Sequence, residues 1–382
     1  MRIAILTYHR AYNCGAALQA WALKVVLERM GHSVEFPVLN HVGELGRWVP
    51  GWVQWDRNPF FVLRSFAVRV VRNALSVPVE DLMRARFRAF RKSFLAERHC
   101  SDEQLADNYD LIVVGSDQVW SAPLSGKDAP VFFAESLPTD IPKIGYGISY
   151  GDTTLPADGM SRILAAVPRF RALSFRERIA QEQVFEMSGV HSDVVLDPTL
   201  LLTAHDYGGF TGAFKPPKEP YLFLYALGSD SVLIDAARRL AERLGVRAIM
   251  TSMYQYSRYG APQGLTYAIS PDRLVGYVAN ARYVLTSSFH GTALATIFRK
   301  PFLSMLMERD SPPCRSRVGN LLKTAGDLAR LVTPQTPVEE MIKMLNAPVE
   351  PSRALEEQRR FSIDWLKDKI LEVGQRDVGK RA

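Results

Sequence analysis

The sequence predicts an α/β protein built from two units, each with a parallel sheet. Short apolar runs alternate with amphipathic stretches from the N-terminus onward. This pattern stops in a glycine- and proline-rich stretch over 208–220 and restarts at Tyr221. A length of 382 residues also favours two domains over one. Strands that alternate with helices imply parallel sheets with right-handed crossovers.

The first unit is predicted to open with a β-α-β motif. Residues 2–7 form an apolar strand, 15–30 have helical spacing and stop at Gly31, and 33–38 form the second strand. Residues 59–99 predict one or two helices rich in Phe, Val and Arg. The remaining strands are predicted at 111–114, 143–149, 172–175 and 194–196. The run 111–114 is wholly apolar, which is typical of a buried parallel strand.

The second unit repeats the alternation. Strands are predicted at 221–227, 246–250, 283–286 and 301–305, and helices at 231–244, 271–281 and 291–298, with a turn at 228–230. A charged helical tail follows over 337–373. The predicted division is therefore a first domain over 1–207, a linker over 208–220, a second domain over 221–335 and a helical segment over 336–382.

Composition excludes several classes of protein. Apolar residues are 47% and charged residues 23%, as in ordinary globular proteins and unlike disordered or collagen-like chains. No window of about 18 apolar residues predicts a transmembrane helix, and the apolar N-terminal stretch is too short for a signal peptide. The three cysteines, Cys14, Cys100 and Cys314, are too far apart in the sequence for a metal-binding motif. Their number is odd, and no disulfide framework can be built from them. We therefore expect a cytoplasmic protein without a metal site.

The net charge of +7 is concentrated in one segment. Residues 57–99 hold ten Arg or Lys against three acids, which accounts for the whole excess. Phenylalanines are interleaved with these arginines, namely Phe60, Phe61, Phe66, Phe87, Phe90 and Phe94. One interpretation is a cationic, partly apolar face that contacts the inner face of the cytoplasmic membrane. The other places the phenylalanines in the core and the arginines on a solvated helix face.

Candidate site residues follow the apolar strands, because open parallel sheets bind ligands at the carboxyl ends of their strands. The strongest candidate is His290, which lies between a strand and the start of a helix, beside Ser288, Gly291 and Thr292. An imidazole next to free backbone N–H groups suits an anion whose chemistry needs proton transfer. The alternative is that Ser288 caps the helix and His290 bonds locally.

The other strand ends leave alternatives open. Asn13 can cap the helix that follows it, and Asp117 can bind a sugar hydroxyl, act as a base or cap a helix. The ring of Trp120 is expected either in the core or as a surface on which a sugar stacks. Arg176 indicates a phosphate or carboxylate ligand, or an ion pair with Glu177 or another acid. No GxxxxGK[ST] loop occurs and residues 145–147 lack a third glycine, so ATP or a dinucleotide is not indicated.

Together these strand-end motifs resemble the polysaccharide pyruvyl transferase family. The matching segments are 13–20 (NCGAALQA), 114–120 (VGSDQVW), 143–146 (KIGY), 173–177 (LSFRE), 195–200 (VLDPTL) and 287–292 (SSFHGT), followed by Arg317–Val318. They run in order from residue 1 to about 325, so the resemblance covers most of the chain. Ser287 stands where Asp is common in the family, and 293–296 match loosely; no match is claimed over 40–105.

The resemblance implies a GT-B-like fold, with two Rossmann-like domains facing across a cleft and a C-terminal helix packed back on the first. It also implies transfer of a pyruvyl group from phosphoenolpyruvate to two hydroxyls of one sugar, with formation of a ketal and release of phosphate. The acceptor would be a polysaccharide or a lipid-linked oligosaccharide. Neither a metal nor an organic cofactor is required.

The resemblance also assigns roles to the candidate residues. His290 is the expected proton-transferring group, with Asp117 as a second catalytic residue. The donor-binding set is Arg176, Arg317, Ser288, Gly291 and Thr292. The acceptor-binding set on the first domain is Asn13, Gly15, Ser116 and Trp120.

Two other functions compete with this prediction. A GT-B glycosyltransferase would use the same cleft with a nucleotide-sugar donor. A basic nucleic-acid-binding protein would use the segment 57–99, but no known nucleic-acid-binding motif accompanies that charge, so we expect no nucleic-acid partner.

Overall fold

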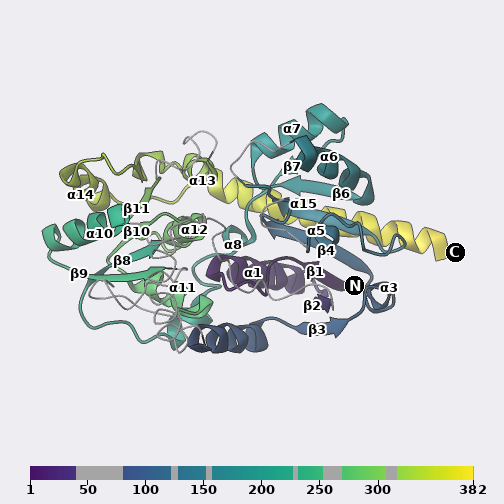
Figure 1. Cartoon of the computed structure of the whole chain (residues 1–382), viewed down its shortest axis with the longest axis horizontal. Coiled ribbons are helices and arrows are strands. Elements are labelled where there is room, and N and C mark those ends of the chain that lie inside the picture. The colour runs from purple at the N-terminus through teal and green to yellow at the C-terminus, as the bar shows by residue number, and fades with distance from the viewer. Residues whose placement is uncertain are drawn as a thin grey trace, which may run out of the picture.

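Two parallel sheets lie side by side along the long axis of the molecule (Figure 1). The computed structural model describes residues 1–39, 81–121, 128–151, 157–226, 231–252, 269–306 and 316–381. Within these residues the first sheet has the strand order β3-β2-β1-β4-β5-β6-β7 and the second the order β12-β11-β10-β8-β9. The predicted α/β class with two parallel sheets is therefore confirmed.

The seven-stranded sheet belongs to the first half of the chain. Its strands are β1 (Arg2–Leu6), β2 (Ser33–Leu39), β3 (Glu97–Cys100), β4 (Leu111–Asp117), β5 (Lys143–Ile148), β6 (Ala172–Phe175) and β7 (Asp193–Val194). The helices of this half are α1 (Cys14–Arg29), α3 (Gln104–Asn108), α5 (Ala129–Phe132), α6 (Ala157–Ala166), α7 (Arg178–Ser188), α8 (Pro198–Leu201) and α9 (Gly208–Ala213), and residues 81–94 are also helical.

The five-stranded sheet belongs to the second half. Its strands are β8 (Tyr221–Ala226), β9 (Arg247–Ser252), β10 (Tyr283–Thr286), β11 (Phe302–Met305) and β12 (Leu331–Val332). The helices are α10 (Ser231–Arg243), α11 (Pro271–Asn280), α12 (Phe289–Ile297), α13 (Arg317–Ala325), α14 (Val338–Asn346) and α15 (Arg353–Arg381). The predicted turn at 228–230 lies outside the described residues, and the proposed domain boundaries stay a prediction.

Several local predictions differ from the structure. The predicted loop over 208–220 begins with helix α9, because Phe210 is buried against Trp21 at 4.6 Å between ring centroids. Residues 97–99, predicted as helix, belong to β3, which pairs with β2. The predicted strand 194–196 is displaced to Asp193–Val194. The helical tail is interrupted at 347–352, where Pro348 and Pro351 cannot donate a helical hydrogen bond.

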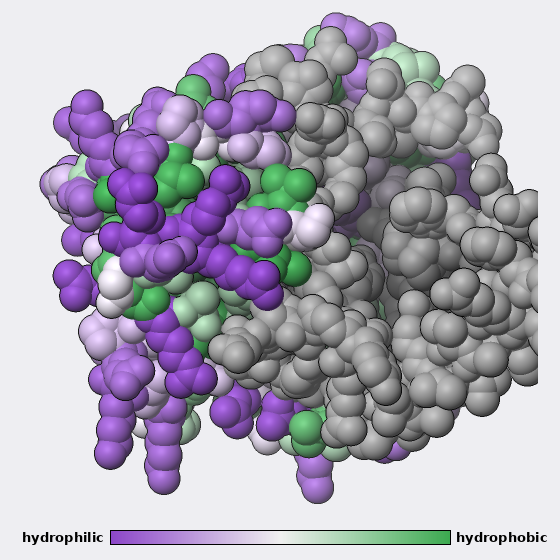
Figure 2. All heavy atoms as spheres, turned by 60° about the vertical axis from the view of Figure 1, so that its left-hand side comes forward, coloured by the Kyte–Doolittle hydropathy of each residue, from purple (hydrophilic) through white to green (hydrophobic). Residues whose placement is uncertain are grey.

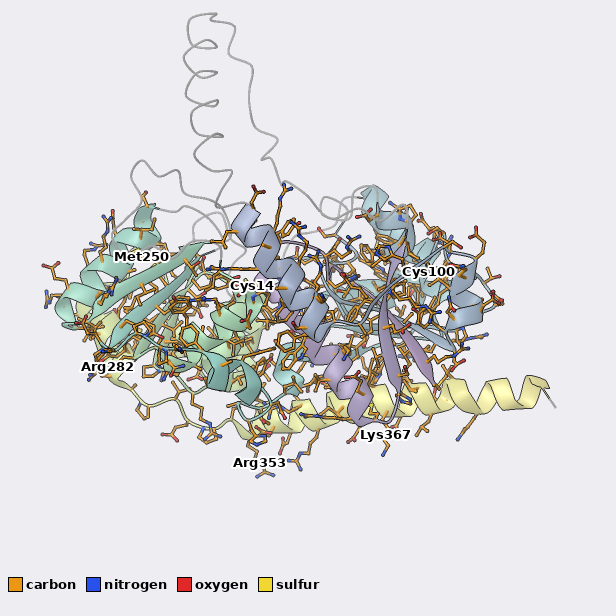
Figure 3. The ribbon with its side chains drawn as sticks, turned by 90° about the horizontal axis from the view of Figure 1, so that it is seen from below. Cys14, Cys100, Met250, Arg282, Arg353 and Lys367 are labelled. Atoms are coloured by element: carbon orange, nitrogen blue, oxygen red, sulfur yellow. The ribbon has the colours of Figure 1, made fainter. Side chains whose placement is uncertain are left out.

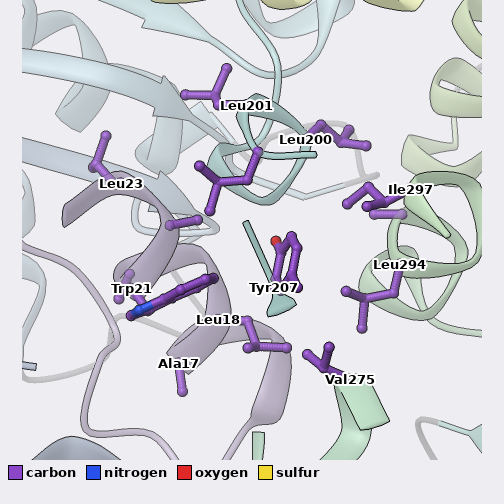
Figure 4. Close-up of a cluster of buried hydrophobic side chains, with 14 of the residues drawn as sticks. Ala17, Leu18, Trp21, Leu23, Leu200, Leu201, Tyr207, Val275, Leu294 and Ile297 are labelled. Atoms are coloured by element: carbon purple, nitrogen blue, oxygen red, sulfur yellow. The ribbon is translucent and has the colours of Figure 1, made fainter. Parts of the chain in front are cut away.

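Helices from both halves form a shared apolar layer between the sheets (Figure 4). On the first side α1 contributes Trp21 and α8 contributes Leu200; on the second side α11 contributes Val275 and α12 contributes Leu294. The buried ring of Tyr207 packs between Trp21 and Phe298 in tilted and edge-on contacts, at 5.2 and 5.9 Å between ring centroids. This layer fixes the carboxyl ends of the two sheets relative to each other, which matters for the site described below.

The C-terminal helix α15 returns to the first sheet, as predicted. It runs from the second half along the first, and it ends on the far side (Figure 1). Ser362 Oγ accepts a hydrogen bond from the backbone N–H of Leu196 at 2.9 Å, and Trp365 donates to Asp193 at 2.8 Å. Arg359 donates to the carbonyl of Leu200 at 2.6 Å. These bonds anchor the loop between β7 and α8, which carries a residue of the candidate site.

The described surface in one view is mostly hydrophilic, and two of the three cysteines lie in the described part of the chain. Hydrophilic side chains dominate the described part of the face in Figure 2, with hydrophobic ones in separate patches. Cys14 lies near the middle of the molecule and Cys100 in the first half (Figure 3), and both are free thiols. Cys314 lies outside the described residues. Of the helices described, none has the length and apolar character needed to cross a membrane.

His9 supplies a test of the first sheet's stability. Its ring follows β1 and is buried against Phe36, with neighbouring charges from Arg10, Arg91 and Glu97. Burial, helped by the two arginines, lowers the pKa of His9 from 6.5 to about 3. Unfolding therefore takes up a proton between these pH values, so stability falls as the pH falls from 6.5 toward 3, by about 1.4 kcal/mol for each pH unit crossed.

We expect His9→Gln to flatten this part of the pH dependence, because glutamine does not titrate. Urea unfolding between pH 7 and 4 measures the effect. A variant whose stability falls as steeply as that of the wild type would show that His9 does not contribute to the acid sensitivity.

Candidate active site

Four charged or titratable side chains from both halves meet where the sheets face each other. Asp117 ends β4, Arg176 follows β6, Asp197 begins α8, and His290 lies in the first turn of α12. The first three belong to the seven-stranded half, and His290 belongs to the five-stranded half. All four are buried. The structure thus brings together His290, Asp117 and Arg176, which the sequence interpretation placed at separate strand ends.

Arg176 is the centre of this cluster. Its Nη1 donates to Asp197 Oδ2 at 2.8 Å, its Nε donates to Glu177 Oε1 at 3.0 Å, and its Nη2 lies 3.8 Å from Asp117 Oδ1. Its guanidinium also lies 4.8 Å from the centre of the Phe289 ring. Burial lowers the pKa of Arg176, but the carboxylates outweigh it and hold the pKa above its ordinary value. The ion-pair alternative is therefore the observed one.

One guanidinium nitrogen nevertheless remains without a hydrogen bond. Among the described residues, no group accepts a hydrogen bond from Nη2 of Arg176, which is buried. A buried donor without an acceptor is costly in free energy, and such groups commonly meet a ligand. Nη2 is therefore the one nitrogen of Arg176 that is left to bind an anionic substrate.

Asp197 is held by several groups at once. It caps α8, with Oδ1 accepting from the Thr199 N–H at 3.0 Å and from the Thr199 hydroxyl at 2.7 Å. Its Oδ2 accepts from Arg176 and, at 3.5 Å, from Ser116 Oγ, and it lies 3.6 Å from Nε2 of His290. Burial raises the pKa of Asp197, but His290, Arg176 and Thr199 outweigh this effect and hold it well below its usual range.

His290 is confined by the first half of the chain. A Cβ at position 15 would overlap the imidazole ring at Nδ1, so only glycine fits where α1 begins. Nε2, the other nitrogen of the ring, faces the carboxylate of Asp197. The close approach of α1 explains Gly15, which the sequence interpretation had assigned to acceptor binding: the position makes room for His290.

The start of α12 differs from the expected donor site. Helix α12 begins at Phe289, two residues before the predicted start, and Ser288 caps it. The N–H of Gly291 donates to Ser288 Oγ at 3.4 Å and the N–H of Thr292 to the Ser288 carbonyl at 2.9 Å. The Thr292 hydroxyl bonds Ser304 at 2.7 Å. These groups are therefore engaged within the protein, and their part in donor binding stays a prediction.

Two predicted acceptor residues are corrected by the structure. Trp120 is fully buried, donates to the Phe132 carbonyl at 2.9 Å and stacks on Phe133, so it belongs to the core. Ser116 is also fully buried, and its single hydroxyl proton faces two acceptors, the Gly147 carbonyl at 3.2 Å and Asp197 Oδ2 at 3.5 Å. Both support the fold beneath the site and cannot contact an acceptor in this arrangement.

Asn13 and Arg317 occupy the rim of the same region. Asn13 caps α1, and its Oδ1 accepts from the N–H groups of Gly15 and Ala16 at 2.8 and 3.2 Å. Arg317 begins α13, and with the amide of Gln118 turned toward it both of its Nη groups donate to Gln118 Oε1. Since Gln118 follows β4, this bond is a second link between the halves.

Sequence reasoning missed Asp197 and Glu177 as site residues. Asp197 stands in the matching segment 195–200, directly before a proline at the start of a helix, which by itself indicates only an N-cap. Glu177 was considered only as a salt-bridge partner. Burial raises the pKa of Glu177, while Arg176 and Arg317 act in the opposite direction. No group of three or more metal-ligating side chains occurs in the described part of the chain.

The sequence matches a known family over most of its length. The family described as polysaccharide pyruvyl transferase matches residues 13–307, a range that contains Asp117, Arg176, Asp197 and His290. No protein of curated function matches the sequence.

Solved structures resemble the fold. The UDP-GlcNAc 2-epimerase from Neisseria meningitidis is 8% identical with a TM-score of 0.53, over 97% of this chain and all of the other. The UDP-GlcNAc 2-epimerase from Methanocaldococcus jannaschii is 12% identical with a TM-score of 0.51, over 94% and 98% of the two chains. At such identities the likeness concerns the fold alone, and it confirms two Rossmann-like units in a GT-B-like arrangement.

Proposed function

The chain belongs to the polysaccharide pyruvyl transferase family, and on that premise we propose that it moves a pyruvyl group from phosphoenolpyruvate to two hydroxyls of one sugar. The products are a cyclic ketal and inorganic phosphate. The observation that supports this proposal is the buried cluster of His290, Arg176 and Asp117 between the two halves, inside the range that matches the family. It combines a proton carrier, a cation and a carboxylate, which this reaction needs.

The reaction can be written with all protons assigned. C3 of the enol ester gains a proton from His290 while a sugar oxygen bonds to C2, and the proton of that hydroxyl passes to Asp117. The C2–O bond to phosphate then breaks, and phosphate leaves with the electron pair and the proton held by Asp117. The second hydroxyl adds to C2, and its proton returns to His290. One hydroxyl proton thus ends on C3 and the other on phosphate.

We assign donor binding to the cationic side of the site. Nη2 of Arg176 is the guanidinium group still available to an anion, and Arg317 stands at the start of α13. The first turn of α12 adds the positive end of a helix. Three carboxylates surround Arg176, so repulsion limits direct binding of a phosphate there, and we place the phosphate nearer to Arg317 and α12.

The acceptor is assigned to the seven-stranded half. Asp117 has a positive φ of 69°, a strained conformation for a residue other than glycine, which is common at functional sites. Asn13 lies on the same edge of the sheet. We propose that these residues contact the sugar of a polysaccharide or lipid-linked oligosaccharide in the cytoplasm.

Thermal stabilisation by donors tests the proposal first. A ligand at 100 times its dissociation constant stabilises a protein by about 2.7 kcal/mol. We expect phosphoenolpyruvate to raise the melting temperature and nucleotide sugars to leave it unchanged, and phosphate to be released when candidate lipid-linked oligosaccharides are added. Stabilisation by a nucleotide sugar alone would favour a glycosyltransferase of the same fold and contradict the proposal.

We also propose contact with the membrane, and in the described residues the charged side chains rather than the phenylalanines support it. Of the basic segment 57–99, residues 57–80, including Phe60, Phe61 and Phe66, lie outside the described residues. In the helix over 81–94, Phe87 and Phe90 are buried in the core and Phe94 packs against it. The apolar half of the membrane prediction is therefore wrong for Phe87 and Phe90. Arg88, Lys92 and Arg98 remain exposed, so any contact there is electrostatic.

We expect weak, salt-sensitive binding to anionic vesicles. Basic residues at such a surface contribute about 1 kcal/mol each. Co-sedimentation with phosphatidylserine vesicles at low salt measures it, and the double variant Arg88→Glu/Lys92→Glu should reduce the bound fraction several-fold. Wild-type protein that stays entirely in the supernatant would leave only the solvated-helix interpretation.

A further inference from the structure

Asp197 has contacts that go beyond those of a helix cap. We propose that Asp197 is a positioning residue for His290: its carboxylate holds the proton on Nε2 and so makes Nδ1 the nitrogen that transfers protons. This inference rests on the proposed function for its catalytic consequence, but the orientation of the ring can be tested without substrate.

The carboxylate is suited to this task because it is rigid. Both its oxygens are engaged: Oδ1 by two bonds from Thr199, and Oδ2 by Arg176 and Ser116. The loop that carries it is tied to α15 through Leu196 and Ser362. Because the carboxylate is held in one orientation, it favours one orientation of the group that faces it. That group is Nε2 of His290, which lies 3.6 Å from Oδ2 of Asp197.

The partner ring has no competing anchor at that nitrogen. Nε2 of His290 is buried and, within the described residues, makes no hydrogen bond. The only carboxylate at ion-pair distance from His290 in the part of the chain described is Asp197, which belongs to the other half of the molecule. The geometry is therefore that of a donor nitrogen facing a fixed acceptor, at a distance that a small closing movement shortens to a hydrogen bond.

The opposite nitrogen, Nδ1, lies beside Gly15. Because a Cβ at position 15 would overlap Nδ1, only glycine admits the ring in this orientation. With Nε2 held by Asp197, the proton on Nδ1 is the one that can pass to C3 of the enol ester. When the second hydroxyl adds, its proton returns to the same nitrogen, so that no net proton stays on the enzyme.

Asp197 also supplies a fixed negative charge. The pKa of its carboxyl is held well below the usual range, so the group is ionised whenever the enzyme is active. The other charged groups facing Asp197 and His290 are Arg176, with Asp117 and Glu177 behind it.

The substitution Asp197→Asn separates positioning from folding. With its carbonyl oxygen in the place of Oδ1, asparagine still accepts from Thr199 and caps α8. Nη1 of Arg176 loses the acceptor that Oδ2 provided, but Glu177 and Asp117 remain as counter-charges of the guanidinium. The amide NH₂ then faces Nε2. Since it is a donor, Nε2 must accept, and the proton of the neutral ring moves to Nδ1.

Nitrogen NMR of ¹⁵N-histidine-labelled protein reads this change, with His290 assigned through His290→Gln. We expect wild-type His290 to carry its neutral-ring proton on Nε2, and Asp197→Asn to move it to Nδ1. We also expect kcat with phosphoenolpyruvate to fall about 10- to 100-fold, the range for carboxylates that orient a functional histidine, while the KM changes less than about 3-fold.

Asp206→Asn is the matched control. Asp206 also accepts from the N–H and hydroxyl of a threonine, Thr203, and pairs with an arginine, Arg29. Among the described residues, no histidine lies at ion-pair distance from it. Asp206→Asn should leave both the ¹⁵N pattern of His290 and kcat unchanged. An unchanged His290 pattern in Asp197→Asn would overturn the inference whatever the activity. A wild-type enzyme that never consumes phosphoenolpyruvate would instead overturn the proposed function, while the ¹⁵N pattern would still decide the role of Asp197.

Discussion

His290→Ala is expected to lower the turnover of phosphoenolpyruvate about 10²–10⁴-fold, the range for removal of a general acid–base group. No other histidine lies in the described cluster to take over proton transfer, and the ring fills space against Gly15 without tying the two halves by a hydrogen bond. The fold should therefore persist. Phosphate release under saturating donor measures the change, and circular dichroism confirms the fold.

His191→Ala is a suitable control for this measurement. His191 is exposed and contacts Phe185 on the surface of the first half, at 4.6 Å between ring centroids. It should retain wild-type turnover. If His290→Ala also kept turnover within a few-fold of the wild type, His290 would be removed from the mechanism.

Arg176→Ala is expected to lower the free energy of unfolding by about 3–5 kcal/mol, because it leaves buried carboxylates without their cation. Asp197 and Glu177 both depend on this guanidinium and are almost wholly buried. Arg176→Lys restores the charge but not the planar fork that reaches three carboxylates, so it should be impaired to an intermediate degree. Urea unfolding at neutral pH compares the three proteins.

Arg162→Ala provides the surface counterpart. Arg162 also forms two hydrogen bonds to a carboxylate, Glu135, and lies 4.8 Å from the centre of an aromatic ring, Phe133, but its side chain is 34% exposed. Exposed pairs contribute about 0–1 kcal/mol. A similar loss in both variants would show that burial of the Arg176 cluster adds nothing to stability.

The sequence predicted the strands well, because buried parallel strands are short apolar runs with sharp ends. Strands β6 and β10 were predicted at their observed bounds, and β1 and β8 to within one residue. Helix starts were less certain. The prediction for α12 placed its start at Gly291, whereas Ser288 caps the helix three residues earlier. A serine in a polar loop does not show from the sequence which of its neighbours it will cap.

The candidate site could be predicted only in part, because its contacts join residues from different halves of the chain. His290, Asp117 and Arg176 were found through their positions at strand ends. The approach of Asp197 to His290 depends on how two sheets pack, and no local pattern encodes it. For the same reason Trp120 was assigned to the acceptor site although its ring is in the core.

Transfer carried out in D₂O provides a decisive test of pyruvyl transfer by this site. If a group of the enzyme protonates C3 of phosphoenolpyruvate, the methyl group of the ketal must receive one deuteron from solvent. We predict a product with a singly deuterated methyl group, formed together with one equivalent of phosphate and lost in His290→Ala. A sugar product that lacks the ketal methyl group, or one whose methyl group carries no deuterium, would contradict the proposed reaction.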